Sequence, residues 1–469
     1  MFYIRKKSKK LIMKKSFVLL NLFFLLSTLT FSQTNVSGSI SSDTNWGIAE
    51  SPYTVTGNIL VPTGVTLTIE AGVTVNFSAD YYFLIKGNII SSGTIGSLIT
   101  FNGSPSGIPF NFPMIMFKST NLSNSTINYN VFNGFSHSKA IQLADESESN
   151  QDSTKNSGIL TVTYSDFNNS GLYTKGYSTS AELKFENSTF DNLTIKGYYP
   201  RSEPITFTNC VINNSTINSD SYNYGIKIYY STVLNSSFTI GCCGANFLID
   251  NSIIYNSPFT DYNNNYNISL NKSLIINSPL NLSTGGLTIT SSIISFNGFD
   301  TPIGINAKAI TMSNSLISGS GAGTGIKINS YSSASNTISN STLTNNSTGI
   351  FVVGNNGIYD FSNTNLNNNQ SYNVNNGSDQ EISAENNYWG TTTESEIQSA
   401  IYDSSDDFEL GEVDYTPFST SLNIEAPISP PLNVTKSVSG SDVILNWSAN
   451  AESDIAGYKL HYGDPTGYS

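Results

Sequence analysis

Residues 226–256 read IKIYYSTVLNSSFTIGCCGANFLIDNSIIYN and contain one short phrase twice. The phrase is a small residue, any residue, an apolar residue, any residue and then Asn. It runs from Ser231 to Asn235 and again, 21 residues later, from Ser252 to Asn256. The phrase also recurs before and after these two copies, throughout residues 160–390, at intervals of 19 to 26 residues. Successive copies begin with Ser165, Ser188, Cys210, Ser231, Ser252, Ser273, Ser292, Ser315, Ser341, Thr364 and Asn387. A repeat of this length is typical of a solenoid.

Apolar residues stand at fixed distances from the small residue of each copy. Two positions after it come Phe190, Ile212, Val233 and Ile254 in consecutive copies, and other apolar columns stand three and five positions before it. A mostly polar column separates the last two, and alternation with a period of two indicates a half-buried strand. Asn recurs four positions after the small residue. It suits a tight turn because it tolerates left-handed backbone angles, and stacked Asn side chains can form an amide ladder.

Short strands, a bend at a fixed phase and a coil of about 22 residues predict an all-β fold, a right-handed parallel β-helix. Neighbouring coils would pair at a spacing of roughly 4.8 Å. A leucine-rich repeat is disfavoured because no copy contains an amphipathic helix or the Leu-x-x-Leu-x-Leu phrase. A β-sandwich is disfavoured because its strand spacing would not hold one phase over so many copies.

The composition changes along the chain, and these changes predict five segments. Residues 1–32 are expected to be a signal peptide, and residues 33–159 an N-terminal cap with the first coils and an acidic loop. Regular coils follow at 160–390, then a C-terminal cap at 391–426. Residues 427–469 are expected to form a linker and part of a second domain.

The N-terminal segment has the pattern of an export signal. It holds seven of the 21 basic residues and no acidic one. Lys14 and Lys15 precede an apolar run that is too short for a transmembrane helix, and cleavage is expected near Gln33. Without this leader the chain is about 20 charges negative, which disfavours nucleic acid and anionic membranes as partners. We therefore predict a secreted or cell-surface protein whose mature chain has no transmembrane segment.

Two parts of the repeat region resemble secreted right-handed β-helix repeat proteins. Residues Val65–Val73 are similar to the opening coils of that group. Residues Asn386–Gly390, with Ile401–Asp403 and Asp414–Phe418, are similar to its closing coil and cap. The resemblance implies a β-helix over roughly residues 46–420. Members of this group include pectate and alginate lyases, polygalacturonases and noncatalytic surface proteins, so the fold does not choose the activity.

Residues 431–463 resemble the first three strands of a fibronectin type III domain. Trp447 and Tyr458 would be its core aromatic residues. A sandwich domain takes about 100 residues, so this one is expected to be truncated.

Few residues of the coils suit catalysis. A glycoside hydrolase needs paired carboxylates, and the Asp406-Asp407 pair falls in the predicted cap. A polysaccharide lyase needs a Lys, Arg or His base and often Ca²⁺. We assign no catalytic residue, and the chain is not expected to be an enzyme, although a lyase or hydrolase stays an alternative.

Cofactor and metal sites are weakly indicated. The acidic loop of residues 144–157 could supply oxygen ligands for Ca²⁺, but it lacks the alternating Asp-x-Asp-x-Asp-Gly phrase and reads more simply as a solvated loop. Its carboxylates are Asp145, Glu146, Glu148 and Asp152. Cys210 occupies a small-residue position, so we expect a buried thiol. Cys242 and Cys243 are either a strained vicinal disulfide or two thiols in a turn.

The candidate binding site lies on the outward positions of the repeated strand. Four and two positions before the small residue, neighbouring coils carry Lys184, Glu186, Lys227, Tyr229 and Asp250. The two lysines would lie two rungs apart, about 9.6 Å. Aromatic faces with a few polar groups can hold a sugar chain. An ordinary solvated sheet surface explains the same pattern. Further tyrosines nearby are Tyr173, Tyr198, Tyr199, Tyr222, Tyr224 and Tyr230.

Three functions fit these observations. The first is noncatalytic binding of an extracellular polysaccharide or surface glycan, or adhesion. The second is a lyase or hydrolase acting on an extracellular polymer at the Lys184 and Lys227 face. The third is a structural spacer that holds another domain away from the cell.

Overall fold

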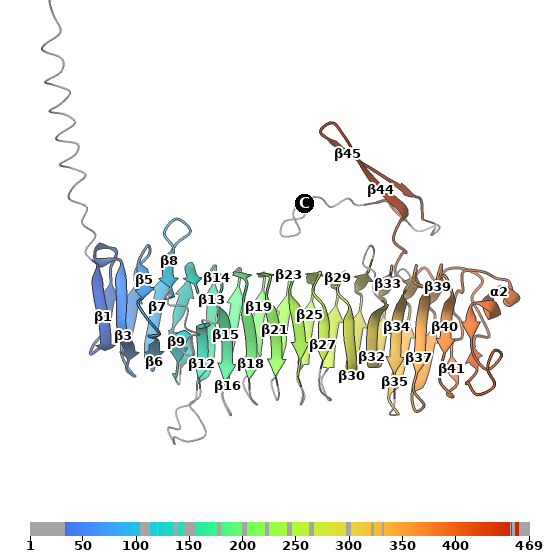
Figure 1. Ribbon diagram of the computed structural model, residues 1–469, viewed down its shortest axis with the longest axis horizontal. Helices are drawn as coiled ribbons and strands as arrows, with labels where there is room; N and C mark the ends of the chain where they lie inside the picture. Colours follow the sequence, from blue (N-terminus) through green and yellow to red (C-terminus); the bar gives the residue numbers. More distant parts are fainter. Residues whose placement is uncertain are drawn as a thin grey trace, which may run out of the picture.

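The computed structural model shows a rod built from stacked coils (Figure 1). The structure describes residues 33–103, 113–119, 121–134, 139–144, 156–175, 180–198, 204–220, 225–241, 246–261, 267–296, 302–319, 323–330, 333–450, 452 and 455–458. Most coils contribute three short strands, and each strand pairs in parallel with the equivalent strand of the next coil. The result is a parallel β-solenoid, which confirms the in-phase winding. Its right-handedness remains a prediction.

The strands form three stacks along the rod, which we call A, B and C. Stack A contains β2 (Thr44–Trp46), β4 (Thr66–Ile69), β7 (Asn88–Ser92), β10 (Thr126–Asn128), β13 (Ser157–Thr163), β16 (Ser180–Glu186), β19 (Ile205–Thr208), β22 (Ile226–Tyr229), β25 (Asn246–Asp250), β28 (Asn267–Asn271), β35 (Ser335–Ser339), β38 (Ile358–Ser362), β41 (Ile382–Ser383) and β43 (Val413–Asp414).

Stack B contains β5 (Thr74–Phe77), β8 (Ile99–Asn102), β11 (Asn130–Asn133), β14 (Asp166–Asn168), β17 (Thr189–Asp191), β20 (Val211–Asn213), β23 (Thr232–Leu234), β26 (Ile253–Tyr255), β29 (Leu274–Ile276), β31 (Ile293–Ser295), β33 (Leu316–Ser318), β36 (Thr342–Thr344) and β39 (Asn365–Asn367). Stack C contains β6 (Phe83–Ile85), β9 (Pro113–Phe117), β12 (Lys139–Ala144), β15 (Gly171–Lys175), β18 (Thr194–Tyr198), β21 (Thr216–Asp220), β24 (Ser237–Ile240), β27 (Phe259–Asp261), β34 (Thr324–Asn329), β37 (Thr348–Val353), β40 (Tyr372–Asn376) and β42 (Ile401–Tyr402).

Four strands cross from one stack to the next. They are β1 (Thr34–Ser39) and β3 (Tyr53–Val61), which cross from B to C, and β30 (Leu280–Thr290) and β32 (Ile303–Ser313), which cross from C to A. Two 3-10 helices, η1 (Ile48–Glu50) and η2 (Leu122–Asn124), lie in connections of the early coils.

The predicted row of apolar residues is present and is buried in the interior of the solenoid. Phe190, Ile212, Val233 and Ile254 are direct partners in successive stack B strands, and each is at most 1% exposed. Earlier in the same row the rings of Phe132, Phe167 and Phe190 stack at centroid distances of 4.8 and 5.0 Å. A continuous apolar interior therefore runs through the rod, as the sequence predicted.

The small residue of each copy forms hydrogen bonds between neighbouring coils. The backbone N–H of Ser231 donates to Ser252 Oγ at 3.1 Å, and that hydroxyl donates to the Asp250 carbonyl at 2.8 Å. The same arrangement recurs at Ser252 and Ser273, where the N–H to Oγ distance is 3.2 Å. The hydroxyl at this buried corner accepts from a backbone N–H of the preceding coil and adds a second donor to a carbonyl that the Tyr230 N–H already reaches at 3.1 Å. This pairing explains why the position is small and polar.

Asn residues make the turns on both sides of the stack B strands. Asn235, four positions after the small residue, has a φ of 46°, as predicted from the sequence. Asn209 and Asn251, one position before the small residue, have φ values of 54° and 50°, a second turn that the sequence analysis did not identify. Both turns need left-handed angles, which Asn adopts more readily than other non-glycine residues.

The predicted Asn ladder is partly formed. Asn192 Nδ2 donates to Asn169 Oδ1 at 2.7 Å, and Asn256 donates to Asn235 at 3.0 Å. A longer ladder lies one position earlier in the early coils. There each side-chain amide donates to its predecessor at 2.9 to 3.1 Å, along Asn76, Asn102, Asn133 and Asn168.

A short helix and a returning segment follow the last coils of the solenoid. The short helix α2 (Glu394–Ser399) follows Thr393 and buries Ile397. Buried Asp403 accepts hydrogen bonds from the backbone N–H groups of Ser405 and Val413, at 2.9 and 3.0 Å. The chain then runs back along stack B, where Asn365 Nδ2 donates to the Asn423 carbonyl at 3.0 Å.

Beyond the cap, the described chain forms an antiparallel hairpin of β44 (Leu432–Ser439) and β45 (Asp442–Ser448), which stands off the rod in Figure 1. The rings of Trp447 and Tyr458 meet edge to face at 5.2 Å, and both side chains are exposed. Two antiparallel strands are not enough to identify a fibronectin type III domain, so that domain remains a prediction. The segment boundaries also remain predictions, and the third predicted strand continues past Tyr458, outside the described residues.

Several predictions fall on residues that the structure does not describe. These are the signal peptide at 1–32, the acidic loop carboxylates Asp145, Glu146, Glu148 and Asp152, and the pair Cys242 and Cys243.

Cys210 occupies its corner as a buried free thiol, and it should be unreactive. Burial raises its pKa from 9.0 to about 12, although the backbone groups of Ser188 and Thr208 counteract this in part. The nucleophilic thiolate is therefore scarce at pH 8. Alkylation at pH 8 followed by mass mapping should leave the Cys210 peptide unlabelled in the folded protein and labelled in guanidinium chloride. Labelling of folded protein as fast as of a free thiol would contradict its burial.

Candidate binding face

The five predicted site residues lie on outward positions of stack A. The register places Lys184, Thr206 and Lys227 in one row, so the two lysines lie two rungs apart as predicted. A second row contains Glu186, Thr208, Tyr229 and Asp250. All five site residues are half-buried, as expected of side chains that flank one another on a sheet. We call the outward surface of β16 to β28 the binding face.

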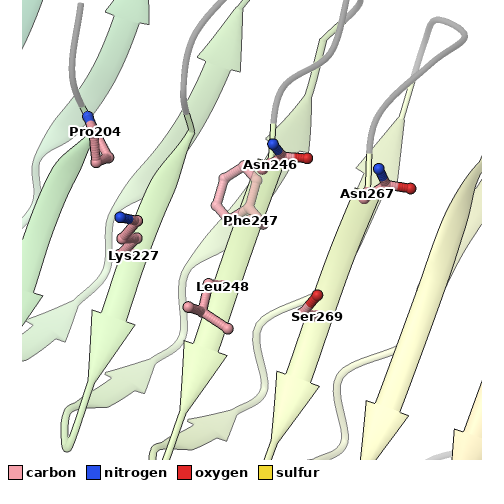
Figure 2. A pocket seen from close by; sticks show the side chains of 7 residues that line it. All are labelled: Pro204, Lys227, Asn246, Phe247, Leu248, Asn267 and Ser269. Atoms are coloured by element: carbon pink, nitrogen blue, oxygen red, sulfur yellow. The ribbon is translucent and has the colours of Figure 1, made fainter.

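A hollow of about 340 Å³ lies on the binding face over β22, β25 and β28 (Figure 2). Lys227 of β22 borders it on one side and Ser269 of β28 on the other, with Leu248 of β25 between them. The other lining residues are Pro204, Asn246, Phe247 and Asn267. The hollow therefore combines an ammonium group, two amides and a hydroxyl with an apolar surface.

Of the hollow's lining, the sequence analysis identified only Lys227 as a binding residue. Leu248 did give a signal, because it is an aliphatic residue in a column that is otherwise mostly Thr, Ser and Lys. Asn246 and Asn267 are partners at the start of β25 and β28. They precede the repeated apolar columns, so the repeat gave no reason to single them out.

The charges of the binding face largely balance. Lys184 Nζ lies 3.2 Å from Glu182 Oε2, and Thr206 Oγ1 donates to Glu182 Oε1 at 3.0 Å. Glu182 was not among the predicted site residues, and it neutralises one of the two predicted cations. In the part of the chain that the structure describes, Lys227 has no such ion pair. The Asn271 amide donates to Asp250.

Tyr229 is a neutral phenol at ordinary pH. Burial raises its pKa above 10.0, and the negative charges of Asp250 and Glu182 raise it further. A phenol whose pKa is raised keeps its proton at pH values up to and above its ordinary pKa. Tyr229 can thus donate and accept hydrogen bonds at pH 7, but it does not supply a phenolate base.

The other predicted tyrosines do not form one aromatic groove with these residues. Tyr173 lies in β15 of stack C, whereas Lys184 and Lys227 lie in stack A. Tyr230 occupies the corner after β22 with a φ of 49° and is 61% exposed. Tyr199, Tyr222 and Tyr224 are outside the described residues, as is the side chain of Tyr198. The wider groove was therefore wrong for Tyr173, because its strand pairs within a different stack from the strands of the two lysines.

Metal and membrane features can be stated for the described residues. Among them, no three His, Cys, Asp or Glu side chains are placed to hold a metal ion together. Asp406 and Asp407 lie in the C-terminal cap between β42 and β43, outside the strands β16 to β28 that form the binding face. None of the helices in the described ranges is long and apolar enough to cross a membrane.

No family model matches this chain, and neither does a curated protein. Among solved structures, it is similar to one described as a new PL6 alginate lyase complex with trisaccharide. That match has 13% identity and a TM-score of 0.30, and covers 92% of this chain and 89% of the other. A second is a mannuronic acid specific polysaccharide family 6 lyase from human gut microbiota, with 10% identity and a TM-score of 0.24, covering 83% and 91%. At such values, the function has to be inferred from this chain's own residues.

Proposed function

We propose that this protein is exported and binds an extracellular polysaccharide without cleaving it, through the binding face of stack A. The observation that carries the proposal is the hollow between β22 and β28, in which hydrogen-bonding groups surround an outward leucine. Sugars present hydroxyl groups at their edges and C–H groups on their faces. A shallow site with both kinds of partner is therefore suited to them.

Catalysis is the second candidate, because Lys227 is a cation without a carboxylate ion pair in the described chain. A lyase would need it as a base or to neutralise a substrate carboxylate. Incubation with pectin, alginate and neutral polymers, followed by ultraviolet absorbance and reducing-end assays, separates the two candidates. We expect no product. Product that forms with the parent protein and is lost in Lys227→Ala would overturn noncatalytic binding.

The substitution Leu248→Asp should weaken polysaccharide binding about tenfold, which corresponds to about 1.4 kcal/mol. It removes the apolar centre of the hollow and adds a charge that a sugar face would have to desolvate. The matched control is Ile293→Asp, which replaces an outward, 42% exposed aliphatic residue of stack B. Affinity electrophoresis against a panel of soluble polymers measures both. Equal affinity of the two variants would exclude the hollow as the binding site.

The remaining parts of the proposal concern export and the C-terminal segment. We propose that the solenoid winds in the right-handed sense and that the protein is secreted or located at the cell surface. Both proposals follow from the resemblance to secreted β-helix proteins. Residues 427–469 are proposed to be a linker and part of a fibronectin type III domain, which would make the solenoid a spacer as well. N-terminal sequencing should show that the exported product begins near Gln33. An exported product that retains residues 1–32 would contradict the predicted signal peptide.

A further inference from the structure

Few charges lie on the outward positions of stack A. From β13 to β35 the cations on these positions are Lys184 and Lys227, and the anions are Glu182, Glu186 and Asp250. Two more cations lie at the edges of the face: Lys272 at the corner after β28, and Lys308 where β32 crosses into stack A. Glu182 already neutralises Lys184. The full chain carries a net charge of −13, so the molecule as a whole does not attract a polyanion.

The rest of this surface is lined with hydroxyl groups in register. Ser269, which borders the hollow, is the direct partner of Thr288, and the row continues through Thr311 and Thr337. A second row runs beside it through Thr290, Ser313 and Ser339. We call these six residues after Ser269 the hydroxyl rows. Thr288 and Thr311 are exposed, and the other four are half-buried.

The spacing of the hydroxyl rows is set by the strands. Successive hydroxyls in one row are about 4.8 Å apart, and the two rows are about 6.6 Å apart because they are two residues apart on each strand. A sugar unit in an extended polysaccharide advances about as far as one rung. Hydroxyl groups of successive sugars could therefore meet successive rungs, beginning at the hollow and continuing toward β35.

We infer that the ligand is an uncharged polysaccharide that lies along stack A, parallel to the rod, across the hollow and the hydroxyl rows. The inference rests on the proposed function and adds the class of polymer and its direction. Hydroxyl-to-hydroxyl bonds need no ion pair, so affinity should depend little on salt. An anionic polymer would instead meet Glu186 and Asp250 with Lys227 as its main attraction.

The experiment compares neutral polymers (β-glucan, xylan and mannan) with alginate and pectate, by affinity electrophoresis at 50 and 500 mM salt. We expect binding to at least one neutral polymer, with a Kd that changes less than about twofold between the two salt concentrations. The double variant Thr288→Val/Thr311→Val should raise that Kd about tenfold, because it removes two hydroxyls and keeps the side-chain shape. Lys227→Met should raise it no more than about threefold. Thr239→Val, on stack C, is the matched control.

The outcomes distinguish the inference from the proposed function. Tighter binding to alginate or pectate, weakened at high salt, would retain a polysaccharide-binding face but overturn the uncharged ligand. Neutral binding that is unchanged in the double valine variant would overturn the path along the hydroxyl rows. No binding to any polymer would remove the proposed function itself. Circular dichroism of each variant separates lost contacts from lost folding.

Discussion

Replacing Phe167 with Ala should lower the free energy of unfolding by about 3–5 kcal/mol. Phe167 is fully buried in stack B, and its ring stacks between Phe132 at 4.8 Å and Phe190 at 5.0 Å. Phe185 of stack A meets it edge to face at 5.5 Å. Truncation would leave a cavity between two coils, because the neighbouring strands are held by their own ladder bonds and cannot close it.

Phe167→Leu is the matched control. Leucine keeps most of the apolar volume but loses the ring contacts, each of which adds about 0.5–1.5 kcal/mol beyond burial. It should therefore cost less than alanine, because most of the cavity is filled. Urea unfolding followed by circular dichroism measures all three proteins. If Phe167→Ala lost less than about 1 kcal/mol, the row of stacked rings would not be the interior of the folded protein.

Much of the fold could be predicted because equivalent residues of successive coils occupy the same environment in the solenoid. Each coil needs an apolar residue at the same phase, so eleven copies reported on one structural position. The Asn turn was also predictable, since a left-handed angle restricts the residue types that fit. The third strand of each coil was missed although the sequence contains a signal for it. Seven positions after the small residue, six consecutive copies carry an apolar residue that the structure buries in stack C: Leu172, Ile195, Ile217, Phe238, Phe259 and Leu280.

The candidate site could be predicted only in part. The outward direction of Lys184 and Lys227 follows from strand alternation, and their two-rung separation follows from the repeat. The ion pair of Lys184 with Glu182 depends on side-chain conformation on one strand. The hollow depends on side-chain sizes across three coils, with Leu248 between Lys227 and Ser269. A repeat pattern describes what the coils share, whereas a binding site is made from what distinguishes them.

The second large effect is expected at the small-residue corner. Ser252→Val should lower the free energy of unfolding by about 3–5 kcal/mol, because two costs add. The backbone N–H of Ser231 loses its partner, which costs about 1–3 kcal/mol for a buried group, whereas the Asp250 carbonyl keeps the N–H of Tyr230 at 3.1 Å. The larger side chain must also fit a corner that is 3% exposed, and overpacking costs about 1–3 kcal/mol.

A series at this position separates the two costs. Ser252→Ala removes the hydroxyl without adding volume and should cost about 1–3 kcal/mol. Ser252→Cys should cost least, because Cys210 already occupies the equivalent corner, where its Sγ contacts the Thr208 carbonyl at 3.4 Å. Urea unfolding should thus rank the variants as Cys, Ala and then Val, from most to least stable. Equal stability of the Ala variant and the parent would mean that the serine column is small for packing alone, and that its hydrogen bonds do not hold the coils together.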